Sequence, residues 1–348
     1  MLAALLESLN SPLALRSVEV AKLEFGQVLV KVSVSGICGA QLHEIRGHKG
    51  NSAFLPHLLG HEGCGIVEDV GPGVTFVSVG QKVVMHWRKG QGIESDFPRY
   101  RMGEQALSGG KVTTLSQYAV VSENRLTPVP METPDEFAAL LGCGLTTALG
   151  VVNNEAALKF GESIAVIGCG GVGLGIIQAA DLAGGYPIVG IDIKREKEPL
   201  ALKMGATHFE TLTSLPGYVE GKEKKNRTFD VIVDTTGNPE AIEFLMPFLA
   251  DSGRFVLVGQ GPPGAKVSFV ADSSFFGMSG KTIRSTQGGQ TNPSTDIPRY
   301  VDMYFSGKLR FEDLITHRFG LSQINKGFDV LSSGTAGRVM IDMRDTVL

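Results

Sequence analysis

The sequence has little cysteine, little net charge and no long apolar run. Four cysteines among 348 residues are too few for a disulfide framework, so we expect reduced thiols and a cytoplasmic protein. A net charge of -4 gives no reason to expect a nucleic acid or a membrane surface as a partner. No apolar run approaches a membrane span. The apolar start at residues 1–6 lacks a basic leader and a cleavage site, so it is predicted to be a strand.

The chain is long and rich in glycine. The length allows two domains with sizeable cores. The 45 glycines fit tight turns and close approach of the backbone to a ligand. We find no internal repeat and no low-complexity tract. These features are typical of a globular enzyme.

The first part of the chain, to about residue 127, is predicted to be rich in β-structure. Residues 28–34 alternate apolar with small or polar side chains, and 65–71 and 82–87 are further short strands between glycine turns. Residues 88–111 are polar and without period, which predicts an irregular surface lobe. Thr133 is the expected cap of a helix that has Pro134 in its first turn and runs to about residue 141. A second helix is expected over 146–153.

From residue 162 the pattern changes to alternating strands and helices. Strands are expected at 164–167, 187–191, 230–234 and 254–258, and helices at 171–183 and 239–250. The first of these strands is entirely apolar, as in a sheet that is covered on both faces. This alternation predicts a doubly wound parallel sheet of the α/β class. The remaining chain is expected to add helices near residues 300 and 324 and a strand at 338–342.

A nucleotide-binding pattern lies between the first of these strands and the following helix. Gly168, Gly170 and Gly173 form G-x-G-x-x-G, with Gly171 and Val172 inside the motif. The glycines permit a tight turn, approach of a pyrophosphate to the helix N-terminus and close packing of helix on strand. Asp192 ends the next strand, where a carboxylate would bond the ribose hydroxyls and favour NAD over NADP. Lys197, close by, weakens that preference.

Three residues have the side chains of a zinc site that keeps one position open. They are Cys38 after a strand, His61 in a glycine-flanked turn, and Cys143 at a helix end. Two thiolates and one imidazole leave the fourth position of a tetrahedral zinc ion for substrate. Zinc polarises a carbonyl and favours the deprotonated form of an alcohol. Cys64 is interpreted as a core thiol, and Cys169 as part of the phosphate turn.

These motifs, in this order, resemble the zinc alcohol dehydrogenase branch of the medium-chain dehydrogenase/reductase superfamily over essentially the whole chain. The resemblance implies a GroES-like catalytic domain from residues 1–144 and 289–348, a Rossmann domain over 145–288, and zinc in the cleft. It also implies a homodimer or homotetramer.

The same resemblance implies roles for single residues. Cys38, His61 and Cys143 would bind the catalytic zinc, with Glu62 as a carboxylate that transiently ligates it. His43 would be the outer proton-relay histidine. Thr147 would contact the nicotinamide, and Arg338 the pyrophosphate.

The chain departs from the family pattern in three places. Residues 88–111 contain no cysteine, so we predict one catalytic zinc and no structural zinc. Ala40 and Gln41 stand where the family usually has Ser or Thr and then Asp. Ala40 has no hydroxyl to relay a proton, which must then use a water, the cofactor ribose or a substrate hydroxyl. Trp87 falls at a wall of the expected substrate pocket.

We therefore expect a zinc-dependent oxidoreductase that transfers a hydride between NAD(H) and an alcohol, aldehyde or ketone. One alternative is a zinc-free NADPH-dependent quinone or enone reductase of the same superfamily. The other is a non-catalytic nucleotide-binding scaffold or redox sensor, whose only support is the missing Ser/Thr-Asp pair. Zinc content separates the first alternative from the main interpretation, and a substrate panel the second.

Overall fold

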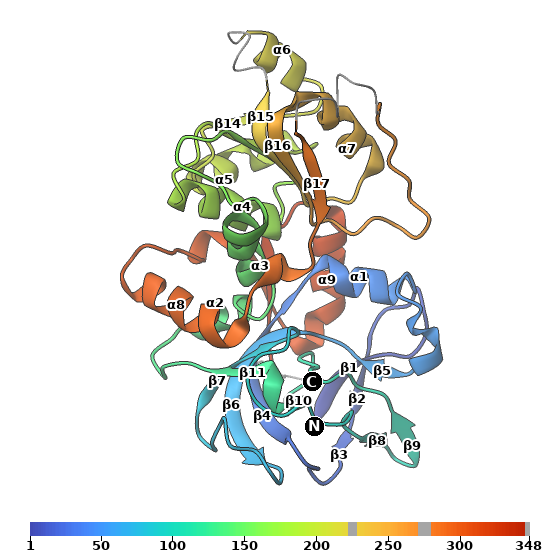
Figure 1. The fold of residues 1–348 in the computed structure, drawn as a ribbon. Coiled ribbons are helices and arrows are strands. Elements are labelled where there is room, and N and C mark those ends of the chain that lie inside the picture. The colour runs from blue at the N-terminus through green and yellow to red at the C-terminus, as the bar shows by residue number, and fades with distance from the viewer. Residues whose placement is uncertain (222–227, 271–279, 345–348) are drawn as a thin grey trace. The chain divides into compact units, whose positions relative to one another are not determined.

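The computed structural model describes residues 1–221, 228–270 and 280–344, and the chain folds into two compact units (Figure 1). The first unit contains Met1–Thr146 and the described residues from Asn292 onward. The second unit contains the described residues of Thr147–Thr291. Nowhere in the described residues is a helix both long and apolar enough to cross a membrane.

The second unit is built on a parallel sheet of six strands. The strands lie in the order β14-β13-β12-β15-β16-β17, and every neighbouring pair is parallel. Their bounds are β12 (Ile164–Ile167), β13 (Ile188–Ile191), β14 (His208–Glu210), β15 (Phe229–Asp234), β16 (Leu249–Leu257) and β17 (Thr282–Ser285). All four residues of β12 are buried, because helices cover both faces of the sheet (Figure 1). The strand order reverses between β12 and β15, where α/β sheets bind ligands. The predicted doubly wound fold is confirmed.

The helices of this unit follow the sequence pattern with two differences. They are α4 (Gly171–Leu182), α5 (Glu198–Lys203), α6 (Leu215–Glu220) and α7 (Pro239–Leu245). The helix expected over 239–250 ends at Leu245, because Pro247 cannot continue it and Leu249 already begins β16. The helix expected over 146–153 begins earlier, as α3 (Gly144–Gly150), and passes into a π-helical turn over Val151–Glu155.

The first unit is organised around the long strand β4 (Gln27–Ile37). Seven strands form its main sheet, in the order β11-β7-β6-β4-β19-β18, with β10 also paired to β4. Their bounds are β6 (Glu62–Val70), β7 (Lys82–His86), β10 (Tyr118–Ser122), β11 (Leu126–Pro128), β18 (Ile315–Gly320) and β19 (Arg338–Asp342). A smaller sheet joins β1 (Leu2–Leu6), β2 (Ala14–Ser17) and β5 (His57–Leu58). The strands predicted at the N-terminus and at 28–34, 65–71, 82–87 and 338–342 are confirmed.

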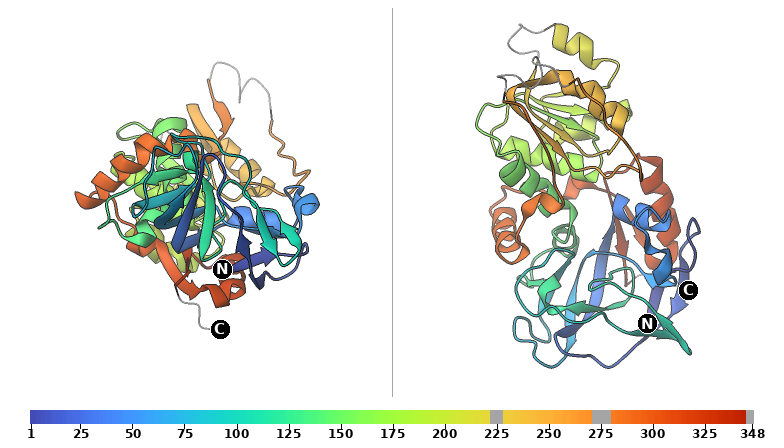
Figure 2. Two further views of the ribbon diagram at one scale, coloured as in Figure 1. Left: turned by 90° about the horizontal axis from the view of Figure 1, so that it is seen from below. Right: turned by 45° about the vertical axis from the view of Figure 1, so that its right-hand side comes forward.

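The chain's last segment belongs to this first unit. Strand β19 pairs antiparallel with β4 through Val339 and Ile37, and β18 lies beside it. Helix α9 (Ile324–Ser333) packs on β18, β19 and helix α1 (Gly39–Ile45), so red and blue segments lie together in Figure 2. Helix α8 (Pro293–Phe305) precedes them.

The segment predicted as an irregular lobe contains a short hairpin, so that prediction was partly wrong. Strand β8 (Tyr100–Met102) pairs with β9 (Gln105–Leu107), and β3 (Glu19–Val20) joins β8. Tyr100 holds this hairpin in place, which the polar composition of the segment does not indicate. Its side chain is 1% exposed, and its hydroxyl accepts from the Val120 amide at 2.9 Å. One buried aromatic thus orders a polar segment.

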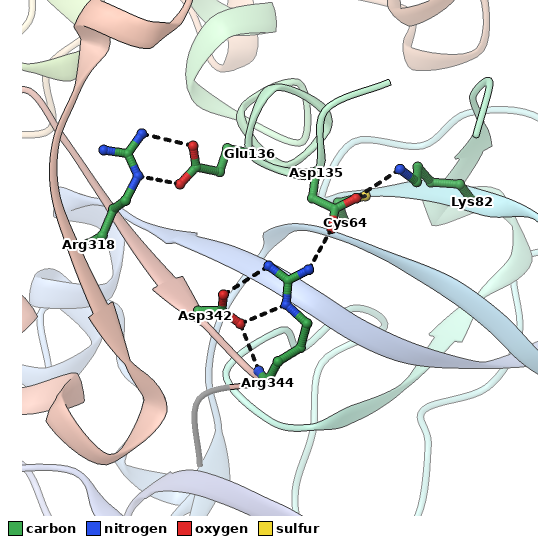
Figure 3. A network of polar contacts seen from close by, with 7 residues as sticks. All are labelled: Cys64, Lys82, Asp135, Glu136, Arg318, Asp342 and Arg344. Atoms are coloured by element: carbon green, nitrogen blue, oxygen red, sulfur yellow. Dashed lines mark hydrogen bonds and ion pairs between the residues drawn. The ribbon is translucent and has the colours of Figure 1, made fainter. Parts of the chain in front are cut away.

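Helix α2 (Asp135–Leu140) begins one residue later than predicted. Pro134 occupies the cap position with an extended backbone, and the buried Thr133 hydroxyl makes no hydrogen bond in the described structure. The helix start is instead fixed by ion pairs: Asp135 contacts Lys82 at 2.9 Å and Arg344 at 3.2 Å (Figure 3). Because α2 leads directly to Cys143, these contacts fix the approach to the candidate site.

Candidate metal centre and nucleotide site

Cys38, His61 and Cys143 come together in the first unit. One ligand atom from each lies within 4.8 Å of the others. Cys38 Sγ and His61 Nε2 are 3.2 Å apart. Residues distant in the sequence therefore present two sulfur atoms and one imidazole nitrogen to a single point.

Each of the three lies at the end of an element. Cys38 follows β4 and caps α1, His61 immediately precedes β6, and Cys143 lies in the turn between α2 and α3. Gly142 makes that turn possible, because a Cβ at this position would collide with the Met85 carbonyl oxygen.

Gln41 holds Cys38 in place. Its side-chain Oε1 accepts from the Cys38 amide at 2.7 Å, while the Cys38 side chain accepts from the Gln41 amide. Gln41 is fully buried, and its Nε2 has no hydrogen-bond partner in the described structure. The amide oxygen thus supports the backbone of a candidate ligand, a role that the sequence left open.

The two thiols and the imidazole shift one another's pKa values. A hydrogen bond from Cys143 lowers the pKa of Cys38 well below its ordinary value, and the same contact raises the pKa of Cys143. Burial lowers the pKa of His61, but the charge and the hydrogen bond of Cys38 outweigh it, so the net shift is upward. A cluster that stabilises a thiolate beside an imidazole favours a cation at its centre.

Glu62 is buried beside the cluster and is held by two partners. Its carboxylate forms an ion pair with Arg338, and its Oε2 accepts from the Gly144 amide at 2.9 Å. Burial raises the pKa of Glu62, and Arg338 opposes that shift. Arg338, expected at the pyrophosphate, is 4% exposed and faces Glu62 here.

The donor set fits zinc. Two thiolates and one imidazole nitrogen are ligands that zinc accepts, and three protein ligands are the number found in catalytic sites. The two sulfur atoms and the imidazole Nε2 lie close enough to bind one ion without a rearrangement of the fold.

His43 has a neighbour that sequence reasoning missed. Its Nδ1 lies 3.0 Å from Nδ1 of His48, which follows α1. His48 belongs to no motif of the sequence. Only its spacing of five residues from His43, across the end of a helix, hinted at a contact.

A cavity of 690 Å³ in the first unit includes His61 among its lining residues. Its walls are mainly apolar and come from two segments, one around β5 and one around the β8–β9 hairpin. The lining includes Phe54, Leu58, Phe97, Leu107, Ser108 and Val112, together with the charged Glu44, Arg99 and Arg101. The size is that of small-molecule binding sites.

Ala40 and Trp87, expected at the substrate pocket, are not among the lining residues of this cavity in the described structure. Trp87 packs on the core of the first unit, and the Arg88 guanidinium lies 5.6 Å from its ring centroid. The walls of this cavity come from the segment around β5 and from the β8–β9 hairpin.

The glycine motif of the second unit adopts the expected strand–turn–helix arrangement. Gly168 has φ of +89° directly after β12, and Gly170 caps α4. Gly173 lies so close to the Gly168 carbonyl oxygen that no Cβ would fit. Gly171 and Val172 open the helix, so their amides lie at its N-terminus, where anions bind.

Asp192 and Lys197 form a buried pair beside this turn. Lys197 Nζ is 2.9 Å from Asp192 Oδ2, which also accepts from the Cys169 amide at 2.8 Å. The Lys194 amide donates to Asp192 Oδ1 at 3.0 Å. The carboxylate is thus oriented at the end of β13. Thr147 lies in α3 with 7% of its surface exposed.

Comparisons with known proteins agree over most of the chain. Residues 24–131 match the model of the alcohol dehydrogenase GroES-like domain, and residues 171–306 that of the zinc-binding dehydrogenase. The S-(hydroxymethyl)glutathione dehydrogenase of Paracoccus denitrificans is 30% identical over 366 residues, covering 95% of this chain and 96% of the relative.

Two solved structures share the fold over nearly their whole length. An alcohol dehydrogenase zinc-binding domain protein from Burkholderia ambifaria has a TM-score of 0.88 at 27% identity, covering 98% of each chain. The benzyl alcohol dehydrogenase of Acinetobacter calcoaceticus has a TM-score of 0.85 at 25% identity, again covering 98% of each chain.

Proposed function

Because the chain belongs to the zinc-dependent alcohol dehydrogenase family, we propose that it interconverts an alcohol and its aldehyde or ketone with NAD(H), using one zinc ion at Cys38, His61 and Cys143. The observation that carries the proposal is the convergence of these three ligand atoms within 4.8 Å. A bound zinc ion and a nicotinamide dinucleotide supply the Lewis acid and the hydride carrier.

The chain's own residues have separate tasks in this proposal. Gln41 fixes the backbone of Cys38 through its amide oxygen. Arg338 neutralises Glu62, so that the buried carboxylate does not add an unpaired negative charge to the two thiolates. Ala40 provides no hydroxyl, so the proton leaves toward His43 through a water or a hydroxyl of substrate or cofactor.

We propose a single zinc per chain and a preference for NAD. The hairpin segment has no cysteine and is held by Tyr100 and by Lys111, whose Nζ is 2.9 Å from Glu94. The family's relatives and the cysteine ligand set favour this function over a zinc-free reductase or a non-catalytic scaffold. Asp192, oriented at the end of β13, would accept from the ribose hydroxyls and repel a 2′-phosphate.

Removal of single ligands tests the metal centre. We expect about one zinc per chain by elemental analysis, as for a three-ligand catalytic site. Cys38→Ser and His61→Ala should lose zinc and alcohol turnover while NADH binding, measured by fluorescence titration, is retained. Nucleotide binding survives because the glycine motif belongs to the second unit.

Cys64→Ala is the matched control. Cys64 is a fully buried thiol of β6, and burial raises its pKa, so it is an inert core residue. This variant should keep its zinc and its turnover. Near-wild-type turnover of metal-depleted protein, or two zinc ions per chain, would contradict the proposal.

We propose further that the substrate is an alcohol with a large apolar body. The cavity of 690 Å³ that includes His61 is lined mainly by apolar side chains. Phe54 and Phe97 in that lining are 62% and 64% exposed, and a bound apolar group would cover them. Burial of about 0.8 kcal/mol per methylene corresponds to about a fourfold gain in kcat/KM for each added carbon.

A series of straight-chain primary alcohols tests this substrate class. We expect kcat/KM to rise from ethanol to 1-octanol, and Ser108→Phe, which fills the cavity, to lower the value for 1-octanol by about tenfold. Ethanol should be affected less than twofold. Gln105→Phe is the control, because Gln105 lies in the same hairpin outside the lining. A flat series, or equal effects of both variants, would exclude the cavity as the substrate site.

Cytoplasmic location and assembly into a homodimer or homotetramer stay predictions. The free state of all four cysteines supports a reducing compartment. Light scattering coupled to gel filtration measures the assembly.

A further inference from the structure

His43 and His48 form a pair of imidazole rings joined nitrogen to nitrogen. Their Nδ1 atoms are 3.0 Å apart, their ring centroids are 5.2 Å apart and the ring planes are inclined by 49°. Two ring nitrogens bond at this distance only when one carries a hydrogen and the other does not. The pair therefore shares one proton between its Nδ1 atoms, and two fully protonated rings do not fit this geometry.

We propose that His48 is a positioning residue through which His43 releases the proton of alcohol oxidation to water. A proton taken up at Nε2 of His43 makes the pair cationic. The proton between the rings then passes from Nδ1 of His43 to Nδ1 of His48, and His48 loses its Nε2 proton to water. Exchange with water restores the starting tautomer, and the reverse path supplies a proton for carbonyl reduction. This inference rests on the proposed function.

The surroundings of His43 favour its neutral form. Burial, and after it the charges of His48, Lys49 and Arg46, lower the pKa of His43, whereas Cys38 raises it. Lys49 is itself paired with Glu44 at 3.2 Å. Helix α9, which packs on α1, carries the charged residues Lys326 and Asp329.

The pair also lies where this chain needs it. Ala40 removes the side-chain hydroxyl that would relay a proton, and α1, which carries His43, begins directly after Cys38. The charge of Cys38 raises the pKa of His43. A second imidazole beside the first extends the path to His48, a half-buried residue beyond the end of α1.

The test compares zinc-loaded wild type with His48→Gln. Glutamine still bonds the His43 ring, but it does not pass a proton on. We expect kcat for oxidation of 1-butanol at neutral pH to fall about tenfold and the acid-side inflection of its pH profile to move. Imidazole buffer at constant pH and ionic strength should restore the variant's rate and leave wild type unchanged.

His317→Gln is the control, because it removes a histidine of β18 in the same unit. Zinc content and the melting temperature are measured for each variant, and His48→Asn replaces His48→Gln if the latter does not fold. If His48→Gln keeps the wild-type pH profile and does not respond to imidazole, the relay is overturned while the proposed function stands. Absence of alcohol turnover by zinc-loaded wild type would overturn both.

Discussion

His86 shows how burial alone sets the behaviour of one residue. The side chain is 1% exposed, its Nδ1 lies 2.8 Å from the Arg88 carbonyl oxygen, and its Nε2 lies 2.9 Å from the Thr127 hydroxyl. A neutral ring satisfies both contacts, with Nδ1–H donating and Nε2 accepting. Burial lowers the pKa of His86 to about 4.

This pKa predicts a pH-dependent stability. The unfolded chain binds a proton at this residue below about pH 6.5, whereas the folded chain does so only near pH 4, so stability is lost as pH falls through that window. Between pH 7.5 and 5, the free energy of unfolding should fall by about 2 kcal/mol because of His86. His86→Gln should remove this share in urea unfolding curves, and His317→Gln should not. Equal pH dependence in wild type and His86→Gln would refute the assignment.

At the residue scale, chemistry and spacing predicted which side chains to examine but not all of their partners. The fold brings Cys38, His61 and Cys143 together, as a shared metal requires. The pairing of Glu62 with Arg338 and of His43 with His48 depends on tertiary contacts that no local pattern encodes.

At the scale of elements, periodicity succeeded where burial follows a simple rule. The apolar strands of the parallel sheet are covered on both faces, so composition alone marks them. The β8–β9 hairpin was missed because its order depends on one buried ring, Tyr100, among polar neighbours. Helix ends were displaced where Pro134 and Pro247 decide the boundary.

Asp192, at the end of strand β13, is predicted to set the preference for NAD over NADP. Asp192→Ser removes the carboxylate proposed to bond the ribose and frees Lys197 from its ion pair, so that a cation becomes available to a 2′-phosphate. We expect the ratio of kcat/KM with NAD to that with NADP to fall by at least about tenfold, or 1.4 kcal/mol. Steady-state kinetics with both cofactors measure it.

Asp181→Ser is the control for this variant, because it removes an exposed carboxylate from helix α4 of the same unit. Its cofactor ratio should equal that of wild type. If Asp192→Ser also keeps the wild-type ratio, the carboxylate does not select the cofactor.

At the scale of the whole molecule, sequence patterns predicted the parallel sheet, and the family resemblance supplied the rest. The local sequence pattern of residues 292–344 does not reveal that they join strand β4. Strand β19 meets β4 through Val339 and Ile37, and Arg344 reaches Asp135 at the start of α2 (Figure 3). Such long-range pairings follow from topology, which local patterns do not contain.

The return of β19 to β4 sets an order of events on the ribosome. The second unit is one continuous stretch, Thr147–Thr291, and leaves the exit tunnel complete while β18, α9 and β19 are still inside the tunnel or not yet translated. Until they appear, the edge of β4 around Val34 and Ile37 stays open to pairing with another chain. The nascent chain thus holds a complete second unit while the first unit still lacks strand β19.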